Sequence, residues 1–111
     1  MNPPSLPHHR LQVWQLALEL VQLVHHIRIA DAEDRQQARK AASSCARNIA
    51  EGAARRSRAD KARVYAIARG ECGETVASVE LSGVKGGSSV ADVQRVVELG
   101  SRVSAMLYRL G

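Results

Sequence analysis

The sequence predicts an all-α protein, an up-down-up-down four-helix bundle that forms a single domain over residues 11–111. Three observations support this prediction. Apolar residues recur at helical spacing in four segments, short polar or glycine-containing connections separate these segments, and no stretch reads convincingly as a strand. At 111 residues, the chain is long enough for one hydrophobic core but keeps a large surface for its volume.

The first ten residues contain three prolines and no apolar run, so we expect an extended N-terminal tail over residues 1–10 and no secretory signal. The first helix is expected to follow over residues 11–27, where eleven of seventeen residues are apolar. Its polar residues form one narrow stripe and leave a broad apolar arc. Part of this arc is expected to face another subunit, although a central place in its own bundle would also explain it.

The second helix is expected to begin at Asp31, because an aspartate can cap the free amides and two further acids, Glu33 and Asp34, oppose the helix dipole. Small side chains then share one face, which allows another helix to approach closely. They are Ala38, Ala42, Cys45, Ile49 and Ala53. Gly52 is expected to end the helix in a left-handed conformation.

The third helix is expected to begin at a capping box formed by Ser57 and Asp60. Two glycines interrupt it, Gly70 and Gly73, and a close helix crossing would explain their cost of about 1 kcal/mol each. A loop over residues 83–89 leads to the last helix, which is expected to begin at Ser88 or Ser89. The two cysteines fall inside helices among small residues, where buried free thiols are expected.

Positive charge is concentrated in the middle of the chain. From Arg35 to Arg69, ten Lys/Arg residues face two acids, a net charge of +8, whereas the whole chain carries only +5. Such an excess points to an anionic partner. Arginines that crowd the turn before the third helix oppose its dipole, a cost that binding of an anion would offset, although a simple solubility role explains them about as well. The candidate nucleic-acid-binding residues are Arg39, Lys40, Arg47, Arg55, Arg56, Arg58 and Lys61.

Catalytic chemistry has little support in the sequence. The four histidines form two adjacent pairs, and helical neighbours point about 100° apart, so neither pair makes a metal site. Glu71 and Glu74 lie one helical turn apart but have no partner histidine, which favours ion pairing over acid-base catalysis. We therefore expect no enzyme activity, no metal and no cofactor. No apolar run reaches the about 18 residues that cross a bilayer, so we expect a cytoplasmic protein without membrane contact.

Three stretches carry a resemblance to a known family. Residues 39–52 read RKAASSCARNIAEG, residues 11–17 contain Val13 and Trp14, and residues 65–70 read YAIARG. Together they resemble the 23S rRNA intervening-sequence proteins, which are small bacterial four-helix bundles. Ala46 stands where that family usually has proline, and Lys61 where an aromatic residue is common. The structural signature residues are Trp14, Asn48, Glu51 and Gly52.

Asn48 and Glu51 lie three residues apart within this signature. If their side chains face the bundle interior, hydrogen bonds there would fix the helix register, and we favour this structural role. Contact with a nucleotide is the alternative that stays open.

The resemblance implies a homo-oligomer, with a pentamer as the expected state, because members of the family form homopentameric barrels. Related accessory proteins of diversity-generating retroelements are basic pentamers that bind nucleic acid and a reverse transcriptase. We therefore expect binding of RNA or DNA through backbone phosphates, with low sequence specificity, because three aromatic residues are too few for a base-stacking platform. The alternative is a protein-interaction scaffold or accessory subunit whose basic middle docks an acidic protein such as a reverse transcriptase.

Overall fold

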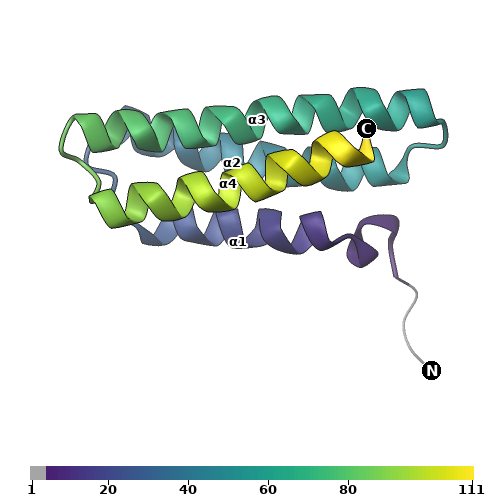
Figure 1. The fold of residues 1–111 in the computed structure, drawn as a ribbon, viewed down its shortest axis with the longest axis horizontal. Coiled ribbons are helices and arrows are strands. Elements are labelled where there is room, and N and C mark those ends of the chain that lie inside the picture. The colour runs from purple at the N-terminus through teal and green to yellow at the C-terminus, as the bar shows by residue number, and fades with distance from the viewer. Residues whose placement is uncertain (1–4) are drawn as a thin grey trace.

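The computed structural model describes residues 5–111 and contains four long helices packed side by side (Figure 1). A short 3-10 helix, η1 (Pro7–Arg10), precedes them. The long helices are α1 (Gln12–His26), α2 (Ala32–Ala54), α3 (Arg58–Val84) and α4 (Val90–Leu110). Successive helices run in opposite directions (Figure 1), and the described residues contain no strand. The predicted all-α, four-helix fold is confirmed.

The N-terminal segment differs from the predicted extended tail at residues 7–10, which form η1. Proline at the first helical position has the backbone angle that a helical turn needs, which explains the short helix. The His8 ring packs edge-on against Trp14 with 4.5 Å between ring centroids, so η1 is attached to the start of α1. Residues 1–4 of the predicted tail lie outside the described residues.

Side-chain caps fix the starts of the last three helices. Asp31, Ser57 and Ser89 each accept a hydrogen bond from the amide three residues later, at 2.9, 3.0 and 3.1 Å. Each bond satisfies one of the free amides at a helix start. The three capping residues agree with the sequence predictions, and Ser89 rather than Ser88 caps α4. The predicted capping box is only half present, because the Asp60 carboxylate pairs with Arg55 and Arg63 instead of accepting from the Ser57 amide.

The hydrophobic core uses most of the apolar arc of α1. Val13, Ala17, Leu20 and Val24 are buried within one subunit, whereas Leu18 is 38% exposed. Packing within its own bundle therefore explains most of the arc, and the part left for another subunit is small. The small face predicted on α2 is also buried. Among residues 5–111, no helix has both the length and the apolar character that crossing a bilayer requires.

Gly52 does not end α2, contrary to the prediction. The helix continues to Ala54 and stops where Arg55 becomes extended, and among the described residues only Gly86 has a positive φ. Gly52 is needed instead for a close approach of α2 and α3. A Cβ at this position would lie 2.8 Å from Cε1 of Tyr65, whose ring is buried.

Gly70 and Gly73 do not mark a close helix crossing either. Both lie exposed on α3, and a Cβ at either position would have no neighbouring atom within 4 Å. The close approach of α3 and α4 occurs at Gly100, where a Cβ would lie 2.4 Å from Cγ2 of Val76. Cys72, which is a buried free thiol like Cys45, donates a hydrogen bond to the Gly100 carbonyl at 3.2 Å.

These contacts predict opposite effects for two glycine substitutions. Gly52→Ala should lower the free energy of unfolding by about 1 to 2 kcal/mol, because the clash with the Tyr65 ring exceeds the gain in helix propensity. Gly70→Ala should raise it by up to about 1 kcal/mol, because the new methyl group meets open space. Urea unfolding monitored by circular dichroism measures both. Equal effects of the two substitutions would contradict the assigned role of Gly52.

Candidate nucleic-acid interface

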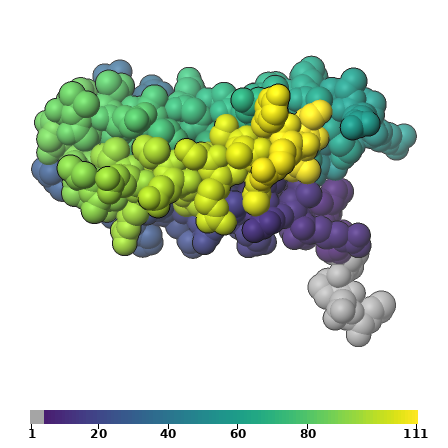
Figure 2. All heavy atoms as spheres, in the orientation of Figure 1, coloured from purple at the N-terminus to yellow at the C-terminus, as the bar shows by residue number. Residues whose placement is uncertain are grey.

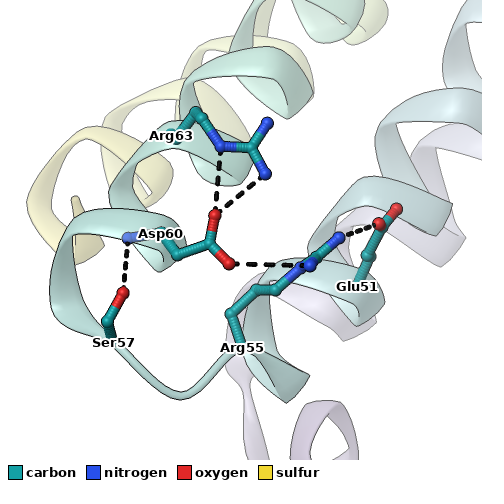
Figure 3. A network of polar contacts seen from close by, with 5 residues as sticks. All are labelled: Glu51, Arg55, Ser57, Asp60 and Arg63. Atoms are coloured by element: carbon teal, nitrogen blue, oxygen red, sulfur yellow. Dashed lines mark hydrogen bonds and ion pairs between the residues drawn. The ribbon is translucent and has the colours of Figure 1, made fainter.

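Ion pairs within the subunit already balance part of the charge at the α2–α3 turn (Figure 3). Arg55 pairs with Glu51 on its own helix and lies 3.5 Å from Oδ2 of Asp60. The other oxygen of Asp60 accepts a hydrogen bond from Arg63 at 2.9 Å. Both acids of the basic segment are therefore engaged here, and Arg55 contributes little free charge to the surface.

The remaining predicted cations of the turn divide into two kinds. Arg56 and Arg58 are exposed, and neither forms an ion pair with any residue from 5 to 111. Lys61 instead donates a hydrogen bond of 2.7 Å to the carbonyl of Ala53 in the last turn of α2. A cation at a helix C-terminus is favoured by the helix dipole, so Lys61 has a structural role as a cap.

A larger concentration of positive charge lies nearer the start of α2. A groove of about 610 Å³ runs between the last turn of α1 and the first half of α2. We call it the basic groove; its lining residues are His25, Ala32, Arg35, Gln36, Arg39, Lys40, Ser43 and Arg47. Four of these eight residues are cations and none is an acid. The structure thus brings together Arg39, Lys40 and Arg47 and separates them from the α2–α3 turn.

Backbone carbonyls orient the arginines of the basic groove. Arg35 donates a hydrogen bond to the carbonyl of Ile29 at 2.9 Å, and Arg39 donates one to the carbonyl of His25 at 3.4 Å. A carbonyl fixes a guanidinium group without cancelling its charge. No cation that lines the groove forms an ion pair within the described part of the chain. The groove is therefore a pre-oriented positive site.

Arg39 has an unused donor. Its Nε atom is shielded from solvent and has no hydrogen-bond partner among residues 5–111. A buried donor without an acceptor is costly, by about 1 to 3 kcal/mol. An anion in the basic groove would supply that acceptor only if the Arg39 side chain turned to expose Nε, since guanidinium groups bind phosphate oxygens in pairs.

Two acids lie near the groove without pairing to it. Asp31 has a lowered pKa, chiefly because the Asp34 amide donates a hydrogen bond to it, with smaller contributions from Lys85 and Arg35. Partial burial and the neighbouring Glu74 raise the pKa of Glu71, against the effect of Lys40. Asp31 and Glu71 are thus close enough to influence Arg35 and Lys40, but they leave the rest of the groove unopposed.

Comparison with known proteins agrees with the fold and the motifs. A model of the family described as 23S rRNA-intervening sequence protein matches residues 9–109. The chain belongs to this family. None of the curated proteins matches the chain. The name of this family specifies no biochemical activity, so the surface of the protein is the guide to its function.

The signature residues of this 23S rRNA-intervening sequence protein lie in different environments. Trp14 and Gly52 serve packing, as described above. Asn48 donates a hydrogen bond to the carbonyl of Ser44 in its own helix at 3.1 Å. The Glu51 side chain is 53% exposed and pairs with Arg55, so it stabilises the end of α2 from outside the bundle. The interior position considered for Glu51 is not observed, and its contact with Arg55 is made at the surface.

Two residues of the basic groove, Arg35 and His25, were not among the binding residues predicted from the sequence. Arg35 precedes Arg39 by one helical turn and belongs to the basic segment, so its spacing was a usable signal. His25 comes from α1, and only the packing of α1 against α2 brings it to the groove. Its Nδ1 lies 2.8 Å from the carbonyl oxygen of Val21, which orients the ring.

The capping contact of Lys61 can be tested separately from binding. Lys61→Ala should lower the free energy of unfolding by about 1 to 2 kcal/mol, because the Ala53 carbonyl loses a charge-assisted hydrogen bond. Binding of RNA by the folded variant should change less than on removal of Arg47. Unfolding curves and fluorescence anisotropy with a labelled oligonucleotide measure the two effects. A variant of unchanged stability that has lost RNA binding would make Lys61 a ligand-contacting residue.

Proposed function

We propose that this protein is a non-enzymatic RNA- or DNA-binding protein that holds backbone phosphates in the basic groove. The observation that carries the proposal is the set of four groove cations that form no ion pair within residues 5–111. Phosphates would replace counterions at these side chains, which is the main source of affinity in nonspecific nucleic-acid binding. Gln36 and Ser43 add neutral hydrogen-bonding groups to the same surface.

Low sequence specificity follows from the placement of the aromatic residues. Trp14 packs against His8, and Tyr65 is buried under Gly52. Tyr108 is exposed, but Arg69 lies over its ring at 4.9 Å from the centroid. None of the three rings lines the basic groove. Binding therefore depends on phosphate charge rather than on stacking of bases.

The proposal predicts salt-dependent binding that requires the groove. Arg39→Ala combined with Arg47→Ala should weaken binding of a labelled RNA at least tenfold at low salt, because two phosphate contacts are lost. The slope of log affinity against log salt should fall by about 1.4 for a single strand. Fluorescence anisotropy at several salt concentrations, with single-stranded RNA and with duplex DNA, measures both quantities.

Arg102→Ala is the matched control for this experiment. Arg102 lines a second groove, between α1 and α4, where Glu19 and Glu98 balance the positive charge. Its removal should leave RNA affinity within about twofold. If the wild-type protein binds neither nucleic acid at low salt, the proposal fails. Binding of an acidic polypeptide such as polyglutamate under the same conditions would then favour the role of a protein-interaction scaffold.

We also propose that the protein forms a homo-oligomer, with the pentamer implied by the resemblance as the expected state. The support lies on α3, which runs along the upper edge of the molecule in Figures 1 and 2. Ile67, Leu81 and Val84 are 44%, 54% and 88% exposed on this helix. Burial of these side chains in a subunit contact would remove apolar surface from water.

The α3 surface can be tested by the mass of the protein in solution. Five chains of 12.0 kDa predict a particle of about 60 kDa by light scattering. Leu81→Lys combined with Val84→Lys should shift the mass towards that of one subunit, because charge then replaces the exposed apolar surface. Leu18→Lys is the control on α1, where little apolar surface remains exposed. Dissociation by the Leu18 variant alone would place the contact on α1 instead.

A further inference from the structure

We infer that the basic groove receives the end of a nucleic-acid chain and binds a terminal phosphate monoester beside Arg35 and Arg39. This inference rests on the proposed function and specifies its ligand. It depends on the charges beyond each of the two ends of the groove and on the hydrogen-bond donors that line it.

One end of the groove is closed by negative charge. The lining residue Ala32 belongs to the first turn of α2, which also contains Glu33 and follows the cap Asp31. Both acids are exposed, and neither forms an ion pair within the described residues. Lys85 lies near both and pairs with the neighbouring Asp34, so three acids face one lysine at this end. A strand that continued past Arg35 in this direction would bring its next phosphates towards two carboxylates. Like-charge repulsion therefore favours a strand that stops here.

The other end of the groove is open to a polyanion. Arg47 lies eight residues beyond Arg39 on α2, about 12 Å at the helical rise. The next acid along the helix, Glu51, already pairs with Arg55. The exposed Arg56 follows at the α2–α3 turn. The charges thus give the ligand a direction, with its end at Arg39 and its body towards the turn.

The donors at the closed end suit a monoester better than an internal phosphodiester. A terminal phosphate carries close to two negative charges at neutral pH and presents three acceptor oxygens. The groove has two carbonyl-held guanidinium groups at this end, from Arg35 and Arg39. An internal phosphodiester, with one charge, would leave more of this capacity unused.

The test compares oligonucleotides that differ only at their ends. One RNA sequence is prepared with a 5′-phosphate, with a 3′-phosphate, with two hydroxyl ends, and as a closed circle. A hydroxyl-ended RNA that is two nucleotides longer controls for the added charge, because each internal phosphodiester adds one negative charge and the monoester adds close to two. We expect one of the phosphorylated forms to bind about tenfold more tightly than the hydroxyl-ended and circular forms, because it gains charge-assisted hydrogen bonds. Which form gains shows whether the 5′ or the 3′ end is held.

Variants then assign the preference to residues. Arg39→Ala should abolish the preference for the phosphorylated end, whereas Arg58→Ala at the turn should weaken all linear forms by a similar factor. Ser43→Glu, which places a negative charge in the groove one helical turn from Arg39, gives a second test if Arg39→Ala unfolds the protein, because its carboxylate competes with the phosphate for Arg39.

The possible outcomes separate this inference from the proposed function. Equal affinity for all forms of the RNA, with strong salt dependence, would overturn end recognition and leave nonspecific binding in place. Failure of every form to bind at low salt would overturn both. A preference for the phosphorylated end that survives in both groove variants would also reject the site assigned here.

Discussion

The close packing of α2 against α3 is the contact on which the rest of the structure depends. The α2 face that meets the bundle consists largely of alanine, with Cys45 and Ile49, and Gly52 accepts the Tyr65 ring at its end. Because no bulky side chain holds the two helices apart, their backbones approach closely. The long cationic side chains of α2 are confined to the outward faces of the helix. One packing requirement thus explains both the small residues and the position of the charge.

Outward placement alone would give an ordinary solvated surface, in which cations find acids nearby. The two parts of the basic segment differ in this respect. At the α2–α3 turn, Glu51 and Asp60 engage Arg55 and Arg63. In the basic groove, the last turn of α1 and the connection that follows it supply neutral carbonyls instead. Arginine charge is therefore neutralised by ion pairs at the turn and stays available to a ligand in the groove, although both sites belong to one basic stretch of sequence.

Sequence reasoning was most successful where the cause is local. The caps at Asp31 and Ser57 depend on residues within one turn, and the small face of α2 follows from helical periodicity. Gly52 and Gly70 were misassigned because a glycine signals backbone freedom or close approach equally well, and only the neighbouring helix decides which. Part of the groove was predicted, because Arg39, Lys40 and Arg47 share a helix. His25 was not, because only tertiary packing brings it to them. The pairing of Arg55 was missed because a net charge does not show which cations are neutralised.

The two proposed surfaces are compatible because different helices carry them. The basic groove lies between α1 and α2, whereas the exposed apolar residues lie on α3, so the two proposed surfaces share no residue. A single groove with four cations would bind an oligonucleotide weakly at physiological salt. Several copies in one assembly would present several grooves to one chain end, so a phosphate that leaves one groove would meet another at a high effective concentration, without any new contact. Self-association would then act on affinity through repetition of the site, and the acids at one end of each groove would make every copy prefer a chain end.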